Sequence, residues 1–486
     1  MILLKETILN KLQANPVTQQ MVQFGNNIGN LLPNEEALCM ASAFMQDKQT
    51  RIVVKKNRYE AQQLYQRLKP LIDDTLLFVM EESLRVQAIA SSPEDKQEQL
   101  YVLTQLVKED KPRIIICNTA AFLRYLPDIE LFKSLCFKFE VDQEITMTEL
   151  KQKLNRAGYT KVNYVDRPCT YASRGGIVDV YCLEYEHPIR IEFFDTVIES
   201  IRLFHEETQR TIETVDSVLI NPATDLLFTD DQIEYLQKEI DSELEKQHEK
   251  LIQDDYDFLL DYIEKDKISI ENYDIDPHLY IYFSYLKANK LTDYVKGHII
   301  FSSQEEVENG YKKLNEETIS FIQEMVESHQ YLPKYSMYHD LFTFKNEYNI
   351  QMFHDFLDFK NPIFSKIETL EKSDQPLIQI LENLKGENIY ISLDEEHTKK
   401  VEEALKAYSI HKNITFIEDN FYEGFTYEDI SVYTQQELFH RPSQIKRYQK
   451  TFKQGLILQN ILELEPNDYV VHEQYGIGQY VGITTR

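Results

Sequence analysis

Hydrophobic and polar residues alternate with a period of two through much of the segment 171–210. Successive side chains of a β-strand point to opposite faces, so the run 189–194 places its two isoleucines and Phe193 on one face and Arg190 and Phe194 on the other. If the aliphatic face is buried, Phe194 is an aromatic ring on the solvent side beside Arg190, which is the composition of a protein-binding surface. The alternative is a sheet covered on both faces, in which Phe194 is an ordinary core residue.

Turn residues interrupt this alternating pattern. Gly175 and Gly176 break the first run, and because glycine adopts positive φ without steric cost, they indicate a bend that redirects the side chain of Arg174. The Glu-His-Pro sequence at 186–188 predicts a turn before the next strand. The alternating run 211–220 is expected to close the same sheet.

Short aliphatic runs alternate with helical periods on either side of this segment. Residues 51–118 follow the order strand, helix, strand, helix, strand, and residues 377–439 contain a second, smaller unit that ends in a strand at 429–439. The acidic run 230–263 predicts one amphipathic helix or a helical pair. The pattern therefore predicts a multi-domain α/β chain in which the alternating strands form an α+β part.

The composition is that of a globular protein, with 42% hydrophobic and 27% charged residues among 486. No uncharged apolar run is long enough to cross a membrane, and the N-terminal apolar stretch carries Lys and Glu, so we expect a soluble, cytoplasmic protein without a membrane partner. The five cysteines form no Cys-x-x-Cys pair, which argues against a zinc cluster or a disulfide framework.

The chain is strongly acidic. Its 52 Lys and Arg residues are outnumbered by 81 Asp and Glu residues, giving a formal net charge of −29. Because non-specific affinity for nucleic acid comes from neutralising phosphates with cations, the chain by itself should bind DNA poorly. The basic residues of the run 441–453 stand out against this background, and a solvated linker helix is the simplest interpretation of them.

The sequence lacks the residues of a working nucleotide site. Gly25 and Gly29 precede the first predicted helix, but no Gly-Lys-Ser/Thr follows there or elsewhere, so we interpret both as loop glycines. The sequence Asp-Glu-Glu-His at 394–397 imitates a helicase metal-binding box, yet without a phosphate-binding loop Ser392 or Asp394 is better explained as the N-cap of the next helix. We therefore expect no catalytic residue, no cofactor and no metal site in this segment.

Two strings in the alternating segment carry a family resemblance. RGGIVDVY and PIRIEFFDTVIESIRLFHEETQR resemble domain 2 of the bacterial transcription-repair coupling factors and of their relative UvrB. In those relatives this domain docks UvrA, the damage-sensing ATPase of nucleotide excision repair. The resemblance implies that Arg174, Arg190 and Phe194 contact UvrA, and the period-two argument independently places two of them on one face.

A second string distinguishes the two relatives. ELEPNDYVVHEQYGIGQYVGI, at 463–483, resembles the start of the RNA-polymerase-interacting domain of the coupling factors, which UvrB lacks. Tyr475 and Gln479 stand where many family members carry His and Arg. Gly476 and Gly478 are interpreted as turn glycines between strands.

The resemblance also implies a domain order. The predicted parts are 1–137, the first half of a degenerate helicase-like α/β domain without a P-loop; 138–222, the UvrA-docking domain; 223–350, the second half of the first domain; 351–440, a small α/β domain of unknown role; 441–465, a basic linker; and 466–486, the truncated start of the RNA-polymerase-interacting domain. On this basis the chain is expected to be an N-terminal fragment whose last residues are poorly ordered.

The leading functional hypothesis is therefore a binding module that recruits UvrA. In the full-length family protein, an ATP- and Mg-dependent translocase that this segment lacks would move on DNA and release stalled RNA polymerase, so partners of this segment would be UvrA and, through the last domain, RNA polymerase. The alternative from another class is a UvrB-like or helicase-type nucleotide hydrolase. A third possibility, an acidic mimic of DNA, is supported only by the net charge.

Overall fold

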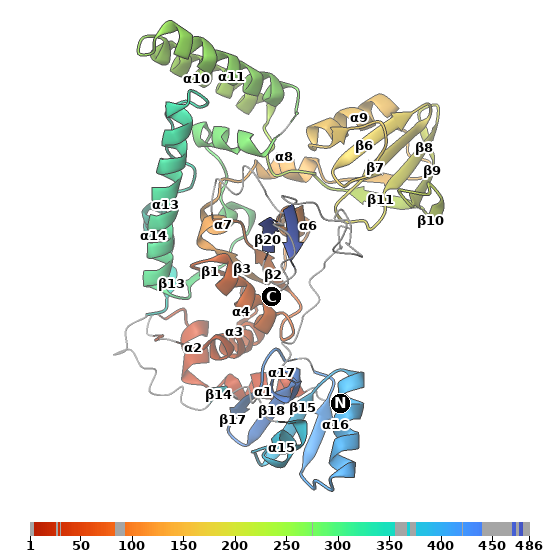
Figure 1. Ribbon diagram of the computed structural model, residues 1–486, viewed down its shortest axis with the longest axis vertical. Helices are drawn as coiled ribbons and strands as arrows, with labels where there is room; N and C mark the ends of the chain where they lie inside the picture. The colour runs from red at the N-terminus through yellow and green to blue at the C-terminus, as the bar shows by residue number, and fades with distance from the viewer. Residues whose placement is uncertain are drawn as a thin grey trace, which may run out of the picture. The chain divides into compact units, whose positions relative to one another are not determined.

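The structure is a computed structural model that describes residues 4–25, 28–29, 31–82, 93–274, 276–354, 367–369, 376–419, 421–439, 469–472 and 476–479 (Figure 1). The chain forms two compact units, residues 1–447 and residues 448–486. The first unit contains three sheets of five or six strands, one two-stranded sheet and all of the described helices. The predicted basic linker, residues 441–465, lies outside the described residues.

A five-stranded parallel sheet of order β13-β12-β1-β3-β2 forms the centre of the first unit. Its strands are β1 (Arg51–Lys55), β2 (Thr75–Phe78), β3 (Ile114–Asn118), β12 (His298–Phe301) and β13 (Ile350–Met352). β1, β2 and β3 are buried almost throughout, as expected for a parallel sheet covered by helices. The predicted α/β class is confirmed, and segments on both sides of the docking domain contribute strands to this one sheet.

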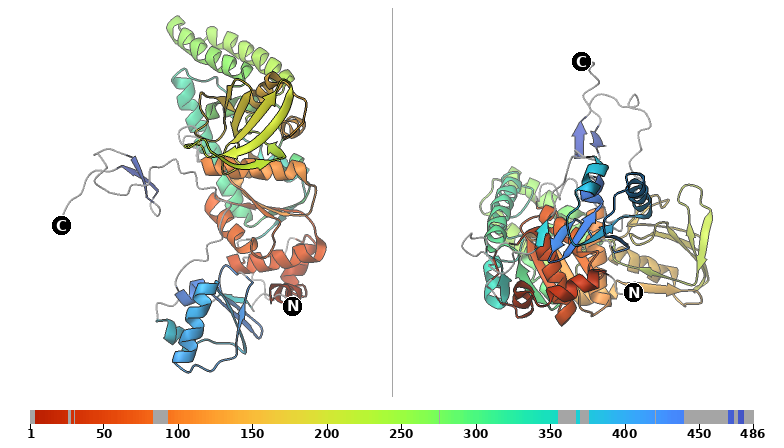
Figure 2. Two further views of the ribbon diagram at one scale, coloured as in Figure 1. Left: turned by 90° about the vertical axis from the view of Figure 1, so that its right-hand side faces the viewer. Right: turned by 90° about the horizontal axis from the view of Figure 1, so that it is seen from below.

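Helices from both halves of the chain surround this sheet (Figures 1 and 2). They are α1 (Leu4–Leu12), α2 (Pro16–Val22), α3 (Pro33–Asp47), α4 (Arg58–Leu68), α6 (Pro93–Lys108), α7 (Thr119–Leu123), α8 (Ile129–Ser134), α12 (Leu291–Tyr294), α13 (Gln304–Glu327) and α14 (Leu341–Glu347). Gly25 and Gly29 lie outside helices and strands, as predicted. The long helix α13 begins at the carboxyl end of β12, where Ser303 accepts a hydrogen bond from the backbone N–H of Glu306 at 3.1 Å.

The inserted domain contains a six-stranded sheet of order β10-β9-β8-β7-β6-β5. Its elements are α9 (Met147–Arg156), β5 (Thr160–Lys161), β6 (Thr170–Arg174), β7 (Ile177–Tyr181), β8 (Ile189–Phe194), β9 (Val197–Phe204) and β10 (Thr211–Val215). Helix α9 covers only one face: Tyr171, which shares that face with Val180 and Ile189 through the strand register, donates a hydrogen bond from its hydroxyl to Asn155 of α9 at 2.7 Å. The opposite face carries Arg190 and Asp179.

The predicted closure of this sheet by residues 211–220 is only half right. β10 forms the edge of the six-stranded sheet, but its residues are mostly exposed, including Ile212 at 50%. β11 (Ser217–Ile220) leaves that sheet and pairs antiparallel with β4 (Phe137–Glu140), in the register Ser217↔Glu140 to Ile220↔Phe137. The two strands thus join the entry and the exit of the inserted domain.

A buried ion pair lies close to the same entry and exit. Arg124 precedes the inserted domain and Asp225 follows it, and the guanidinium donates to the carboxylate at 2.6 Å, with side-chain exposures of 10% and 8%. The guanidinium also lies over the ring of Tyr280, 4.4 Å from its centroid. We call Arg124 and Asp225 the junction ion pair.

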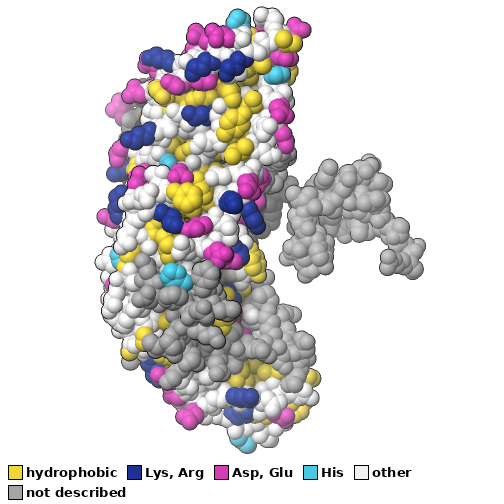
Figure 3. All heavy atoms as spheres, turned by 90° about the vertical axis from the view of Figure 1, so that its left-hand side faces the viewer, with side chains coloured by type: hydrophobic (Ala, Val, Ile, Leu, Met, Phe, Trp, Pro, Cys, Tyr) yellow, Lys and Arg dark blue, Asp and Glu magenta, His cyan; other side chains and the backbone are white. Residues whose placement is uncertain are grey.

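Two acidic helices follow the inserted domain, and they form a pair rather than one long helix. α10 (Asp230–His248) and α11 (Gln253–Glu271) are packed together, and their charged residues are largely paired and solvated, as in Lys238–Glu234 and Lys265–Asp261. Figure 3 shows one face of the molecule, on which Lys and Arg side chains are interspersed with Asp and Glu side chains and hydrophobic groups. This mixture is typical of a solvated surface.

A histidine fixes the end of α11 to the following 3-10 helix, η1 (Pro277–Tyr285). His278 contacts Asp266 of α11 and Asp276 at 2.8 Å each, and Asp266 also accepts a hydrogen bond from the hydroxyl of Tyr282 at 2.7 Å. Burial alone would lower the pKa of His278, but the hydrogen bonds and charges of the two carboxylates outweigh burial and raise the pKa to about 9.

The small α/β domain contains a sheet of order β14-β17-β18-β15-β16. Its elements are β14 (Ile367–Thr369), α15 (Leu377–Glu382), β15 (Asn388–Ser392), α16 (Glu395–Ala407), β16 (Ile414–Ile417), β17 (Phe425–Tyr427), β18 (Ile430–Thr434) and α17 (Gln435–Phe439). The predicted strand at 429–439 is therefore too long, because its second half is helical. Asp394, one of the two predicted candidates, is the N-cap of α16 and accepts from the backbone N–H of His397 at 2.8 Å.

The second unit contains an antiparallel hairpin of β19 (Tyr469–His472) and β20 (Gly476–Gln479). The prediction of strand at Val470 and Val471 is confirmed. Gly476 and Gly478 were predicted as turn residues, and this is wrong: they belong to β20 and pair with His472 and Val470.

Breaking the junction ion pair should destabilise the first unit. Asp225→Asn leaves the buried guanidinium of Arg124 without its charged partner, so we expect a loss of about 3–5 kcal/mol in the free energy of unfolding. Urea unfolding followed by far-UV circular dichroism measures it, which suits a chain without tryptophan. The control Asp261→Asn breaks an exposed pair and should cost less than about 1 kcal/mol; equal losses in the two variants would contradict the role of the junction.

The stabilisation by His278 should depend on pH. Its folded pKa lies above the unfolded value, so the contribution is complete below pH 6.5 and is lost as the pH rises through about 9. We expect His278→Gln to lower the free energy of unfolding by about 1–3 kcal/mol at pH 6 and by much less at pH 9.5. Urea titrations at the two pH values, with the exposed His411→Gln as control, would contradict this if both variants showed the same pH profile.

Candidate docking site

The predicted docking residues lie on the face of the six-stranded sheet that α9 does not cover. Along β8 the burial alternates as the sequence predicted: Ile189, Ile191 and Phe193 are buried, whereas Arg190 is intermediate. Phe194 ends the strand with 74% of its surface exposed, the highest value among the large hydrophobic side chains of the described residues. The alternative of a sheet covered on both faces is therefore wrong at Phe194.

Arg190 is bound within the domain. Its Nε and Nη2 atoms donate to the two carboxylate oxygens of Asp179 on the neighbouring strand, at 2.7 and 2.8 Å, and Nη2 also donates to Gln209 at 2.7 Å. Its guanidinium lies over the ring of Phe204, 4.2 Å from the centroid, and only 16% of its side chain is exposed. The hydrogen bonds that Arg190 donates to Asp179 are the main reason that the pKa of Arg190 is raised. Arg190 thus links side chains of the domain to one another, and little of it is exposed for a partner.

Arg174 is the more accessible of the two arginines. It ends β6, and 52% of its side chain is exposed. The carboxylate of Asp179 is 4.0 Å away, beyond hydrogen-bond distance, and the ring of Tyr164 lies 4.9 Å below the guanidinium. The bend predicted at the two following glycines is present, because Gly175 has a φ of +56°.

The bend and a bulge set the position of Phe194. The backbone carbonyl of Gly176 accepts a hydrogen bond from the N–H of Phe193 at 2.8 Å, which ties the bend to the end of β8. Between Glu192 and Phe193 the pairing with β9 shifts by one residue, as Phe193 faces Ile198 and Glu192 faces Ser200. Bulges change the direction of a strand end. Arg174 and Phe194 therefore lie at the same end of the sheet.

Two residues of this face were missed by sequence analysis. Asp179 is 5% exposed at its side chain and is the carboxylate on which the position of Arg190 depends. Period-two reading places it on the polar face, but only the register Asp179↔Arg190 shows the two as direct neighbours. Tyr164 lies before the sheet's recognisable strands, so no local signal connects it with Arg174.

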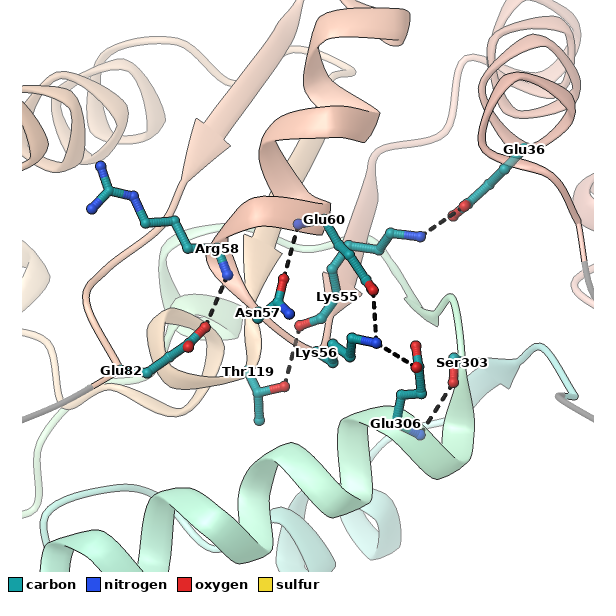
Figure 4. A network of polar contacts seen from close by, with 10 residues as sticks. All are labelled: Glu36, Lys55, Lys56, Asn57, Arg58, Glu60, Glu82, Thr119, Ser303 and Glu306. Carbon is teal, nitrogen blue, oxygen red and sulfur yellow. Dashed lines mark hydrogen bonds and ion pairs between the residues drawn. The ribbon is translucent and has the colours of Figure 1, made fainter. Parts of the chain in front are cut away.

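The nucleotide-like part of the fold contains a second candidate site. At the carboxyl ends of β1 and β12, where α/β sheets bind ligands, lies a cavity of about 770 Å³. Seven of its lining residues are charged: Glu36, Lys55, Lys56, Glu60, Arg67, Glu305 and Glu306. Figure 4 shows Glu36, Lys55, Lys56, Glu60 and Glu306 among them.

The chain's own carboxylates bind the cations of this cavity. Glu36 lies in the first turn of α3 and is 4% exposed. Its carboxylate accepts a hydrogen bond from Lys55 at 2.7 Å (Figure 4) and another from Ser302 at 2.5 Å. A helix N-terminus with a nearby lysine is where a nucleotide fold would bind phosphate. Here the buried carboxylate of Glu36 binds the lysine, Lys55, that would otherwise face the phosphate.

Lys56 is neutralised in the same way. It lies between Glu306 and Glu60, and hydrogen bonds to these carboxylates raise its pKa (Figure 4). Arg67 forms a buried pair with Glu423 at 2.7 Å. A triphosphate would have to displace four internal carboxylate partners of these three cations, which makes this cavity a poor nucleotide site.

Neither a metal cluster nor a membrane segment is found in the part of the chain that the structure describes. There, no three His, Cys, Asp or Glu side chains are grouped in a way that could hold a metal ion. Among the same residues, no helix has the length and apolar character needed to span a bilayer.

The fold and the docking face define the class of the protein. Residues 137–226 match the UvrB interaction domain family, and residues 464–486 match the CarD-like/TRCF RID domain family. The inserted domain is therefore similar to the UvrB interaction domain, and the same chain carries a match to the CarD-like/TRCF RID domain.

Comparison with curated proteins identifies the relatives. The chain is 28% identical to the transcription-repair-coupling factor of Bacillus subtilis over 89% of its own length, and 26% identical to that of Staphylococcus haemolyticus over 94%. A factor from Staphylococcus epidermidis is 26% identical over 99%. The chain is homologous to the N-terminal region of the transcription-repair-coupling factors. It spans 40% to 44% of the length of these relatives.

Removing the buried carboxylate from the cavity should destabilise the central sheet. Glu36→Gln leaves Lys55 and Ser302 without an ionised acceptor, so we expect the free energy of unfolding to fall by about 1–3 kcal/mol. Far-UV circular dichroism in urea measures the change. Glu234→Gln, which breaks an exposed pair, is the matched control and should lie within about 0.5 kcal/mol of wild type. A Glu36 variant as stable as this control would show that the network is not structural.

Proposed function

We propose that this chain recruits UvrA through the uncovered face of its six-stranded sheet, as part of a transcription-repair-coupling factor. The observation that carries the proposal is the exposure of Phe194 at 74% in a domain that matches the UvrB interaction family. A phenyl ring that is retained on the wet side of an otherwise regular sheet has no role in the core. It is suited to fill a pocket on a partner.

The binding step combines burial of this ring with charge. Burying an exposed phenylalanine is favourable by about 1.5–3 kcal/mol, and an arginine gains more from a carboxylate when both are taken from water together. Arg174 supplies an accessible guanidinium at the same end of the sheet. The arrangement therefore suits a partner surface with an apolar pocket and an acidic rim.

The remaining activity of the coupling factor is assigned to other parts of the full protein. We propose that residues 464–486 contribute to binding RNA polymerase, and that movement on DNA with ATP and Mg²⁺ belongs to a motor outside this chain. The net charge of −29 supports a minor role for this segment in DNA binding. The complete protein would act in the cytoplasm, where its five cysteines remain free thiols.

Nucleotide hydrolysis by this segment is disfavoured by the charges of the cavity. Its cations Lys55, Lys56 and Arg67 are each bound by an internal carboxylate. Catalysis of phosphoryl transfer requires cations that face the phosphates and a bound metal. We therefore propose a binding role for this chain, with no catalytic residue.

Phe194→Ala should weaken the complex with UvrA. We expect a loss of about 1–4 kcal/mol in binding free energy, because the ring no longer fills its pocket. Titration calorimetry with purified UvrA measures the affinity, and urea unfolding checks the fold. Phe342→Ala removes a ring that is 57% exposed on α14 and should leave the affinity unchanged. Unaltered affinity in the Phe194 variant would rule out this face.

Arg190→Ala is a less direct test than the sequence suggested. The variant would leave the buried carboxylate of Asp179 without its bidentate partner, so the domain itself should lose stability. Arg174→Ala removes an exposed guanidinium without this effect and is the better probe of charge at the interface.

A further inference from the structure

We propose that Tyr164 is a further contact residue of the docking face, where its ring and the guanidinium of Arg174 together form a binding platform for a carboxylate of the partner. This inference rests on the proposed function and deepens it. The observation behind it is that the guanidinium of Arg174 lies over the ring of Tyr164, with the guanidinium carbon 4.9 Å from the ring centroid. Both side chains are largely solvent-exposed, at 63% for Tyr164 and 52% for Arg174.

The position of Tyr164 is determined by the backbone and not by packing of its ring. The short parallel pairing of β5 with β6 fixes the preceding residues, and the N–H of Val162 donates to the carbonyl of Tyr171 at 2.8 Å. The ring itself stays on the surface. The fold therefore presents an aromatic ring beside Arg174 without burying it, as it does with Phe194.

The contact with the ring leaves the N–H donors of the guanidinium available. A guanidinium that lies over an aromatic ring is attracted by the ring's π-electrons and still has its N–H groups to donate to a carboxylate. Asp179 is the one carboxylate of the described residues within 4.0 Å of Arg174, and both of its oxygens already accept from Arg190. Arg174 is thus held in place by the ring while it keeps donors for a carboxylate on another molecule.

Charge and composition identify the kind of partner. The platform offers a cation beside the exposed ring of Tyr164, at the end of the sheet that also carries the exposed ring of Phe194. Such a surface complements an apolar pocket bordered by Asp or Glu. A phosphate backbone fits less well, because the acidic chain as a whole repels it. We therefore assign the platform to a protein surface, the same UvrA surface that receives Phe194.

The test is a set of tyrosine variants of the whole chain, with UvrA affinity measured by titration calorimetry. Tyr164→Ala should weaken binding about 5- to 30-fold, and Tyr164→Phe should remain within about twofold, because the ring and not the hydroxyl supports Arg174. Tyr408→Ala, which removes a ring that is 56% exposed in the small α/β domain, should bind like wild type.

A double variant separates the platform from two independent contacts. In Tyr164→Ala combined with Arg174→Ala, the loss should be clearly smaller than the product of the single losses, since each residue acts through the other. Full affinity of Tyr164→Ala alongside weakened binding by Phe194→Ala would overturn this inference and leave the docking face intact. Full affinity of both variants would overturn the docking face as well.

Discussion

The structure depends on holding together the two ends of an inserted domain. The chain leaves the central α/β domain near residue 124 and returns near residue 225, and the junction ion pair of Arg124 and Asp225 joins these points at 2.6 Å. The antiparallel pairing of β4 with β11 adds a backbone connection at the same place. The six strands of the sheet all lie within the insertion, and α9 covers one of its two faces.

A second constraint lies within that free face. Both carboxylate oxygens of the buried Asp179 accept hydrogen bonds from Arg190. The negative charge inside the sheet is therefore neutralised within the domain. An uncompensated acid there would be costly. Arg190 is bound to Asp179 within the domain, whereas the side chains of Phe194, Arg174 and Tyr164 project to solvent. The same face thus combines an internally paired Arg190 and Asp179 with exposed aromatic rings.

The same chemistry has the opposite consequence in the cavity of the central domain. There Glu36 occupies the first turn of α3 and binds Lys55, while Glu60 and Glu306 surround Lys56. Internal carboxylates fill the positions that phosphates would need, in the part of the fold where nucleotides bind in related architectures. The cations of this cavity are neutralised by the chain itself, whereas the guanidinium of Arg174 on the uncovered sheet face has its nearest carboxylate at 4.0 Å.

The sequence alone determined what depends on neighbours along the chain. Alternation in 189–194 placed Arg190 and Phe194 on the face opposite the isoleucines, and the glycine pair predicted the bend after Arg174. Asp394 was one of two candidate helix caps, and a missing Gly-Lys-Ser/Thr excluded a standard phosphate loop. Tertiary structure decided what depends on partners distant in sequence. Strand register brought Asp179 to Arg190, the β5–β6 pairing brought Tyr164 beneath Arg174, and β11 left the sheet for β4. Such contacts follow from how separate segments meet in space, which local periodicity does not encode.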